Sequence, residues 1–245
     1  MPDPVRSDGG KILMSAFDSG ISGKNAGKDV DYTFYLVTDT GMCPREKLAD
    51  VVERSVLGGA SIVQLREKNI STRDFLEEAK MLSRVTQKYD VPLIINDRLD
   101  IALAVDCGLH VGQDDMPVET ARKLLGPDRL IGVSAGTLKE ALDAEEGGAD
   151  YLGVGAVFPT GTKTDAVIVS EEDLREIGKR VRIPFVVIGR INRETIPELI
   201  GRGIENISGV AVVSAVMLSP DPEKETAEIR ELFTECRRKA GNGII

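Results

Sequence analysis

The sequence contains no tryptophan, and aromatic residues make up only 4% of its 245 residues. Clusters of aromatic rings therefore cannot build the core, which must consist mainly of aliphatic side chains. Hydrophobic residues reach 42% and charged residues 29%, a balance that excludes a disordered chain. The length allows one domain with a substantial core.

Histidine and cysteine are scarce. His110 is the only histidine, so a Ser–His or Cys–His nucleophilic pair has little support, and we expect His110 to be a packed or hydrogen-bonded core residue. Cys43, Cys107 and Cys236 are odd in number, far apart and form no CxxC pair. This pattern predicts a reducing compartment, and hence a cytoplasmic protein, without a structural metal site.

An excess of positive charge and long apolar runs are also absent. The net charge of −9 argues against a nucleic-acid or anionic-membrane surface, although a local group of cations could still bind a phosphorylated small molecule. No apolar run approaches the roughly 18 residues of a membrane span, and residues 1–31 lack a signal-peptide apolar region. We therefore expect residues 1–31 to be a flexible, disordered extension and residues 32–245 to be the folded domain, with no membrane partner.

From residue 32 onward, a short apolar run alternates eight times with a longer amphipathic segment. The predicted strands are Phe34–Thr38, Ser61–Leu65, Pro92–Asn96, Leu109–Gly112, Leu130–Ser134, Tyr151–Val157, Pro184–Ile188 and Gly209–Ser214. The predicted helices are Pro44–Leu57, Ser71–Tyr89, Asp100–Val105, Pro117–Leu125, Leu138–Glu146, Glu171–Val181, Arg193–Ile200 and Pro222–Lys239. Continuous Val- and Ile-rich runs are typical of parallel strands covered on both faces. Eight such units predict a single (β/α)8 barrel of the TIM type, and the absence of a GxGxxG after the first strand argues against a dinucleotide-binding sheet.

Cations follow the second predicted strand, at the end of a barrel where ligands bind. Because side chains alternate along a strand, Gln64, Arg66 and Lys68 share one face. If Val63 and Leu65 pack against helices, both cations point into the barrel mouth. Buried cations need partners, and the spacing leaves two alternatives open: an anionic ligand, or an inward ion-pair network with acidic residues of neighbouring strands.

Aspartates follow the neighbouring third and fourth strands. Asp97 comes after Asn96, and Asp115 comes three residues after Gly112. Adjacent strands lie roughly 4.8 Å apart, so a carboxylate from each could reach one hard cation. Mg2+ suits this arrangement, since it usually takes one or two carboxylates together with water and phosphate oxygens. From position alone, the alternative that both aspartates cap the following helices stays open.

The remaining strand ends carry groups that suit phosphate. They are Ser134 after the fifth strand, PTGTKT at 159–164 after the sixth, GRIN at 189–192 after the seventh and VSA at 213–215 after the eighth. Backbone N–H groups, hydroxyls and cations in such loops bind phosphate, but each loop could also be an ordinary turn. A Schiff-base aldolase acting through Lys68 or Lys163 is a further alternative, although two flanking carboxylates and Arg66 suit diphosphate chemistry better.

Six sequence blocks together resemble the thiamine-phosphate synthase family. They are VQLREK at 63–68, INDRLDIA at 95–102, LHVGQDD at 109–115, GVSAGT at 132–137, PTGTKTD at 159–165 and VAVVSA at 210–215. The likeness covers about residues 32–234 and implies a transferase of thiamine biosynthesis with Mg2+ as its cofactor. The implied reaction joins 4-amino-2-methyl-5-(diphosphooxymethyl)pyrimidine to 4-methyl-5-(2-phosphooxyethyl)thiazole and releases diphosphate.

The resemblance also implies a role for particular residues. The residues implied to hold the pyrimidine diphosphate are Gln64, Arg66, Lys68, Asn96, Ser134 and Lys163. Of these, Arg66, Lys68, Ser134 and Lys163 would be catalytic, and Asp97 and Asp115 would bind Mg2+. The residues implied to surround the thiazole phosphate are Thr160, Gly161, Thr162, Gly189, Arg190, Val213 and Ser214.

This chain departs from the family pattern at two positions. Gly136 stands where GVSxHT usually has histidine, and Arg190 replaces the second glycine of IGGI. That glycine normally lets the backbone approach the thiazole phosphate, so Arg190 could bind the phosphate by charge or crowd it. Two rival functions are a thiazole tautomerase-like isomerase, which relies on a histidine near the fifth strand, and a non-catalytic binder of thiamine phosphate. The sequence leaves the oligomeric state open and is compatible with a homo-oligomer.

Overall fold

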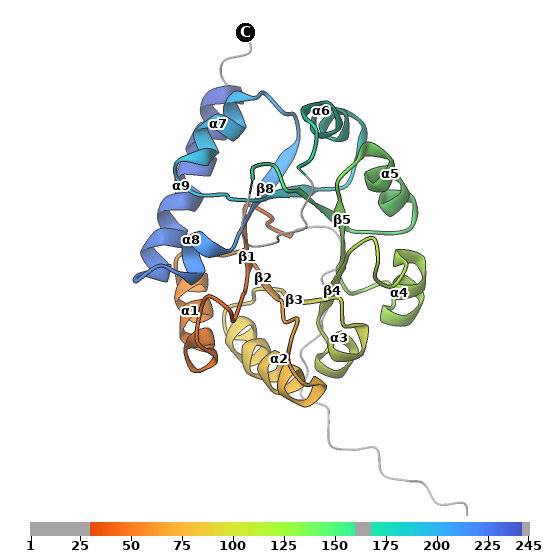
Figure 1. Cartoon of the computed structure of the whole chain (residues 1–245), viewed down its shortest axis with the longest axis vertical. Coiled ribbons are helices and arrows are strands. Elements are labelled where there is room, and N and C mark those ends of the chain that lie inside the picture. The colour runs from red at the N-terminus through yellow and green to blue at the C-terminus, as the bar shows by residue number, and fades with distance from the viewer. Residues whose placement is uncertain (1–29, 160–167, 242–245) are drawn as a thin grey trace, which may run out of the picture.

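The computed structural model describes residues 30–159 and 168–241, whose eight parallel strands form a closed barrel in chain order (Figure 1). The strands are β1 Phe34–Val37, β2 Ile62–Leu65, β3 Leu93–Asn96, β4 Gly108–Val111, β5 Ile131–Ala135, β6 Tyr151–Gly155, β7 Phe185–Ile188 and β8 Ile207–Val212. The last strand pairs with the first, with Phe34 opposite Val210. The predicted (β/α)8 barrel is confirmed.

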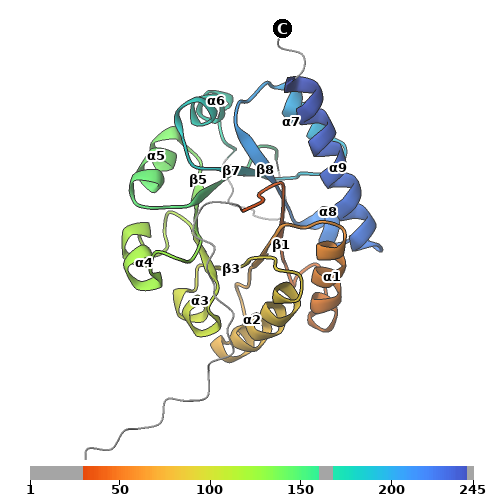
Figure 2. The same ribbon diagram turned by 180° about the vertical axis from the view of Figure 1, so that it is seen from behind.

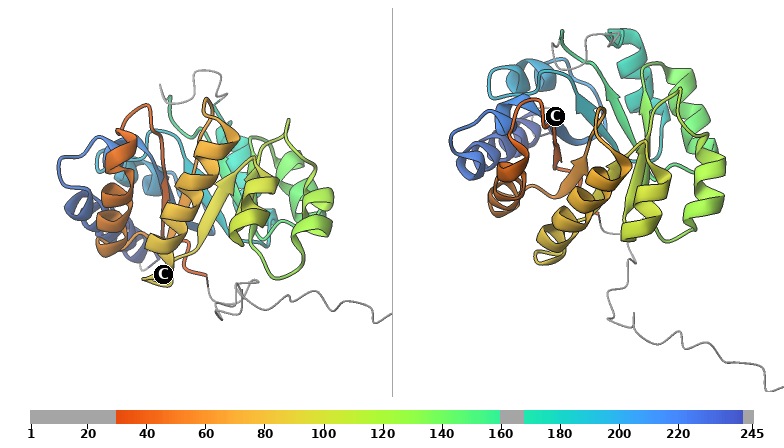
Figure 3. Two further views of the ribbon diagram at one scale, coloured as in Figure 1. Left: turned by 90° about the horizontal axis from the view of Figure 1, so that it is seen from below. Right: turned by 60° about the horizontal axis from the view of Figure 1, so that its bottom comes forward.

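A ring of helices surrounds the barrel (Figure 1 and Figure 3). The helices are α1 Arg45–Leu57, α2 Thr72–Gln87, α3 Leu99–Val105, α4 Val118–Leu125, α5 Leu138–Glu146, α6 Glu171–Arg180, α7 Thr195–Gly201, α8 Ser214–Met217 and α9 Pro222–Gly241. The C-terminal helix α9 packs beside α1, so helices from the two ends of the described chain lie side by side (Figure 2). They lie on the side of the barrel where β1 pairs with β8. Arg54 of α1 donates to Asp221 Oδ1 at 2.7 Å across this contact.

The alternation of side chains along each strand separates two apolar layers. In β1, Phe34 and Leu36 belong to the layer between strands and helices, whereas Tyr35 lies inside the barrel. In β2, Val63 and Leu65 also pack into the outer layer. Gln64 must therefore face the barrel interior, and the predicted inward direction of the β2 cations follows from the same alternation.

Helices α2 and α6 each begin after a serine whose hydroxyl caps the first turn. The Ser71 hydroxyl accepts a hydrogen bond from the backbone N–H of Asp74 at 3.1 Å, at the start of α2. Ser170 caps α6 in the same way, accepting from the N–H of Asp173 at 3.0 Å. These caps satisfy backbone donors that the first turn of a helix leaves unpaired.

The largest differences from the predicted strands occur in β6 and β8. The sixth strand ends at Gly155 instead of Val157, and the eighth runs over Ile207–Val212 instead of Gly209–Ser214. Ile207 lies opposite Phe185 in the ladder, which extends β8 toward its start. Ser214 opens the short helix α8, so the predicted strand end at this residue is wrong.

The predicted extension over residues 1–31 lies outside the described residues except for Val30 and Asp31. The Asp31 carboxylate accepts a hydrogen bond from Arg230 of α9 at 2.6 Å. The position of the domain boundary stays a prediction. Within the described ranges, no helix is long and apolar enough to cross a membrane.

Candidate active site

A cavity of about 520 Å³ opens at the carboxyl ends of the strands and receives side chains from all eight strand ends. It brings together every described residue of the predicted site. These residues are Gln64, Arg66, Lys68, Asn96, Asp97, Asp115, Ser134, Gly189, Arg190, Val213 and Ser214. Thr160, Gly161, Thr162 and Lys163 lie outside the described residues.

The two cations of the β2 end have acidic neighbours. Lys68 Nζ forms an ion pair with Asp97 at the end of β3, and an Arg66 nitrogen lies 3.7 Å from an Asp39 oxygen. The inward ion-pair network that the sequence left open is therefore present. The Lys68 side chain is 49% exposed, and an ion pair in contact with water is weak. An anionic ligand can therefore take the place of Asp97 beside this ammonium group, so the two alternatives do not exclude each other.

The carboxylates of Asp97 and Asp115 lie next to each other in the cavity. The pKa of Asp115 is raised, first by burial and then by a hydrogen bond with Asp97 that favours the protonated form. The Asp115 carboxylate also accepts a hydrogen bond from the backbone N–H of Gly112 at 2.8 Å. Two adjacent carboxylates need a positive charge between them, which a proton or a cation supplies.

Neither aspartate caps the helix that follows it. The N-cap of α3 is Arg98, and that of α4 is Pro117, each without a side-chain cap. Asp97 adopts a left-handed backbone conformation with φ +62°, which is uncommon outside glycine but is tolerated by Asp more than by most residues. The helix-capping alternative for Asp97 and Asp115 is therefore wrong.

Asp97 and Asp115 supply two of the oxygen ligands that Mg2+ needs, and water and a substrate phosphate would supply the others. Among the described residues, no group of three or more His, Cys, Asp or Glu side chains could hold a metal ion. Mg2+ binds through one or two carboxylates plus water and substrate phosphates, so two aspartates beside Lys68 suit a metal that arrives with a diphosphate.

Polar side chains cross the interior of the barrel and line the inner wall of the cavity. His110 of β4 bonds through Nδ1 to the Tyr151 hydroxyl at 3.1 Å and through Nε2 to the Ser134 hydroxyl at 3.0 Å. Burial lowers the pKa of His110 to about 4, so the imidazole is neutral near pH 7. The prediction of a hydrogen-bonded core histidine is confirmed.

Sequence reasoning missed the tyrosines of this interior network. The Tyr35 hydroxyl lies 2.7 Å from the Tyr151 hydroxyl, although the two residues are 116 positions apart. Their inward positions in β1 and β6 follow from strand alternation. Their contact required knowledge of how the strands face each other across the barrel.

The loop after β7 has an unusual backbone. Gly189 has φ +115° and Arg190 has φ +53°, both in the region that favours glycine. The Arg190 carbonyl accepts a hydrogen bond from the Thr195 hydroxyl at 2.9 Å, which anchors this conformation to the start of α7. The backbone thus retains a glycine-type shape at the position where Arg190 stands.

Gly136, which stands where the family usually has histidine, makes a local hydrogen bond through its backbone. The N–H of Gly136 donates to Glu140 Oε2 at 2.7 Å, and Gln113 Nε2 donates to the Ser134 carbonyl at 2.6 Å. Gln113 and Glu140 line the cavity but were absent from the predicted site. Gln113 belongs to the sequence block LHVGQDD, so the family resemblance could have indicated it as a site residue.

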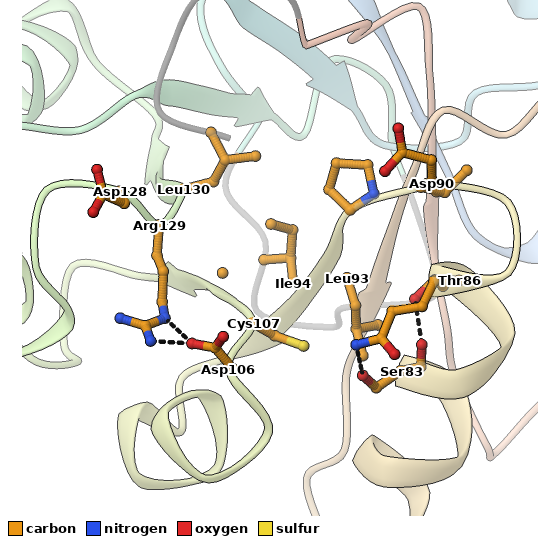
Figure 4. Close-up of a pocket in the computed structure, with 14 residues that line it drawn as sticks. Ser83, Thr86, Asp90, Leu93, Ile94, Asp106, Cys107, Asp128, Arg129 and Leu130 are labelled. Atoms are coloured by element: carbon orange, nitrogen blue, oxygen red, sulfur yellow. Dashed lines mark hydrogen bonds and ion pairs between the residues drawn. The ribbon is translucent and has the colours of Figure 1, made fainter. Parts of the chain in front are cut away.

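A second cavity of about 120 Å³ lies at the amino ends of β3 and β4 (Figure 4). Its walls include the Asp106–Arg129 ion pair and Cys107, whose thiol has its pKa raised to about 12 by burial. The opposite end of a (β/α)8 barrel carries the ligands, so this small cavity lies away from the candidate active site.

Comparison with known proteins connects this geometry to one family. The family model described as thiamine monophosphate synthase matches residues 34–216. A thiamine-phosphate synthase of Clostridium botulinum (strain Eklund 17B / Type B) is 52% identical over 205 residues, covering 83% of this chain and 95% of the relative. One from Clostridium tetani is 48% identical over 209 residues, covering 85% and 99%. Among solved structures, thiamine phosphate pyrophosphorylase from Pyrococcus furiosus superposes with a TM-score of 0.76 at 41% identity, covering 84% of this chain and 98% of that one.

Proposed function

Because this chain belongs to the thiamine monophosphate synthase family, we propose that the mouth of its barrel condenses a pyrimidine diphosphate with a thiazole phosphate in a Mg2+-dependent reaction. The product is thiamine phosphate, and diphosphate is released. The observation that carries the assignment to this cavity is the convergence of Arg66, Lys68, Asp97 and Asp115 at the ends of three neighbouring strands. Cations and a paired carboxylate site are what a metal-bound diphosphate requires.

The diphosphate of the pyrimidine substrate binds at the β2–β4 side of the cavity. Lys68 exchanges its ion pair with Asp97 for the terminal phosphate, and Arg66 contacts the same group beside Asn96. Asp97 and Asp115 would hold Mg2+, which would supply positive charge to neutralise the leaving diphosphate. Ser134 and Gln64 contact the pyrimidine ring deeper in the barrel, where both residues line the cavity.

The reaction is a dissociative substitution at the pyrimidine methylene carbon. The carbon–oxygen bond to diphosphate breaks, and its electron pair leaves with the diphosphate. The aminopyrimidine ring stabilises the resulting cation, and the thiazole nitrogen then forms the new carbon–nitrogen bond with its lone pair. Arg66, Lys68 and Lys163 stabilise the charge that develops on the leaving group. The step needs no general base, which agrees with a neutral, buried His110 as the only histidine.

The thiazole phosphate binds on the opposite side, at the ends of β6, β7 and β8. Gly189, Arg190, Val213 and Ser214 line this part of the cavity. The family resemblance implies that Thr160, Gly161 and Thr162, which lie outside the described residues, also contact the thiazole phosphate. Arg190 contributes a guanidinium group where the family usually offers a glycine backbone. A planar guanidinium binds phosphate with two parallel hydrogen bonds, so charge can replace the lost backbone approach.

The two rival functions have less support. A tautomerase-like isomerase relies on a histidine near the fifth strand, where this chain has Gly136 bound to Glu140. A non-catalytic binder would keep affinity for the substrates without forming product, so only a turnover assay separates it from the enzyme.

The experiment is the formation of thiamine phosphate and diphosphate from both substrates by the purified full chain, with and without Mg2+. We expect stoichiometric formation of both products only with Mg2+, and strong loss of the rate in Asp97→Asn and Asp115→Asn. Asp143→Asn, which removes an exposed ion-pair partner of Lys139 on α5, is the matched control and should retain the rate. Substrate binding without product would establish the binder instead.

A further inference from the structure

Five side chains from five strands form one continuous chain of hydrogen bonds inside the barrel. Gln64 Nε2 lies 2.9 Å from the Tyr35 hydroxyl, which lies 2.7 Å from the Tyr151 hydroxyl. The chain continues through His110 and ends at the Ser134 hydroxyl, with the separations of 3.1 Å and 3.0 Å described above. Each of the first four members is at most 7% exposed, and all five side chains line the inner wall of the cavity.

One assignment of the protons gives every member of this chain a partner. The amide nitrogen of Gln64 donates, so the Tyr35 oxygen accepts. The distances alone allow either tyrosine to donate to the other; in this assignment Tyr35 donates to Tyr151, and Tyr151 donates to Nδ1 of His110. A neutral imidazole that accepts at Nδ1 carries its proton on Nε2, and this N–H donates to the Ser134 oxygen.

Glycines on β5 and β6 make room for the rings of this chain. A Cβ on Gly132 would lie 2.1 Å from Tyr151 Cζ and 2.5 Å from His110 Nδ1. A Cβ on Gly153 would lie 3.1 Å from His110 Cε1. Any larger residue at Gly132 would displace Tyr151 or His110, so the local sequence of both strands is adapted to the network.

We propose that Tyr35, Tyr151 and His110 are positioning residues that make the Ser134 hydroxyl a hydrogen-bond donor toward the substrate. Ser134 accepts from His110, and within the described ranges its hydroxyl makes no other side-chain hydrogen bond. Its proton is therefore directed to an acceptor atom in the cavity. A ring nitrogen of an aminopyrimidine is such an acceptor. This last step rests on the proposed function, because it takes the pyrimidine to be the ligand of Ser134.

The single histidine of the chain makes the proposal directly measurable. Protein labelled with 15N-histidine gives nitrogen signals from His110 alone, and their chemical shifts distinguish a protonated from an unprotonated ring nitrogen. In the substrate-free wild type near neutral pH we expect Nε2 to carry the proton and Nδ1 to be unprotonated. A proton on Nδ1 would reverse the chain and overturn the proposal, whether or not the enzyme turns over.

Tyr151→Phe removes the donor to Nδ1 while keeping the ring. We expect a mixture of His110 tautomers and a fall of about tenfold in kcat, as for the loss of one aligned hydrogen bond, with an unchanged KM for the thiazole substrate. The matched control is Tyr32→Phe, which removes a hydroxyl from a ring that packs against Tyr151 in a tilted arrangement, with ring centroids 5.3 Å apart, but lies outside the chain of hydrogen bonds. This control should keep both the tautomer and kcat.

The possible outcomes distinguish failure of the positioning role from failure of the proposed function. An unchanged tautomer and kcat in folded Tyr151→Phe would refute the positioning role. A wild type with the Nε2–H tautomer but without product formation would refute the proposed function and the substrate-directed step, while confirming the order of protons within the barrel. Thermal unfolding of each variant shows whether a loss of kcat reflects loss of fold.

Discussion

Replacement of Gly189 by alanine should destabilise the protein strongly, because two independent costs meet at this residue. Its φ of +115° lies where side chains are strained. A Cβ at this position would also lie 2.8 Å from Ala156 Cβ, 2.9 Å from Ala156 Cα and 2.9 Å from the Val157 nitrogen. These atoms belong to the backbone or are fixed directly to it, so they cannot move aside as the tip of a long side chain can.

The size of the effect follows from these two costs. A non-glycine residue in such a conformation costs about 1–3 kcal/mol, and a forced contact in a packed region costs about 1–3 kcal/mol more. The sum of about 2–6 kcal/mol lowers the melting temperature by about 4–24 °C, because 1 kcal/mol corresponds to about 2–4 °C in a domain of this size.

Thermal unfolding of three alanine variants separates the contributions. Gly126→Ala carries a positive φ of +85° without any contact within 4 Å, and so measures the conformational cost alone. Gly201→Ala on α7 has neither a positive φ nor a contact, and should leave the melting temperature nearly unchanged or raise it. We expect Gly189→Ala to lose the most. A loss no larger than that of Gly126→Ala would refute the clash with Ala156.

Two further predictions concern a loop and a buried acid. Arg190→Gly should raise KM for the thiazole phosphate by about tenfold or more, since one charge-assisted contact is lost, while Arg190→Lys should lose less. The melting temperature of Arg190→Gly should change little, because relief of the left-handed strain at φ +53° offsets the greater chain entropy of glycine in the unfolded state. An unchanged KM in Arg190→Gly would show that Arg190 does not contact the phosphate. Glu67→Gln should raise the melting temperature at neutral pH, because burial raises the pKa of this carboxyl and one of its oxygens has no hydrogen-bond partner. The gain should shrink as pH falls through the raised pKa of the folded state, and it should vanish below 4.5, where the wild-type carboxyl becomes protonated in the unfolded state as well. Exposed Glu77→Gln is the control, and a gain independent of pH would contradict the cause.

Most of the barrel could be predicted from the sequence because each strand is a short run of aliphatic residues between amphipathic segments. The inward direction of Gln64 followed from the alternation of Val63 and Leu65, both of which pack under the helices. The start of α8 at Ser214 was missed, since a helix of one turn carries no amphipathic period.

The candidate site was predictable at the level of strand ends but not of contacts. Spacing alone could not decide whether Lys68 meets an acid or a ligand, and the structure shows its ion pair with Asp97. The contact between Tyr35 and Tyr151 joins strands on different sides of the barrel. Such contacts depend on the closure of the sheet, which no local pattern records.

The central claim is that Asp97 and Asp115 hold Mg2+ against a diphosphate at the mouth of this barrel. It is tested most directly by calorimetric titration of inorganic diphosphate into the purified full chain, with Mg2+ and with a chelator. We expect saturable binding that requires Mg2+ in the wild type and is lost in Asp97→Asn. Equal affinity without Mg2+, or full affinity in Asp97→Asn, would contradict it.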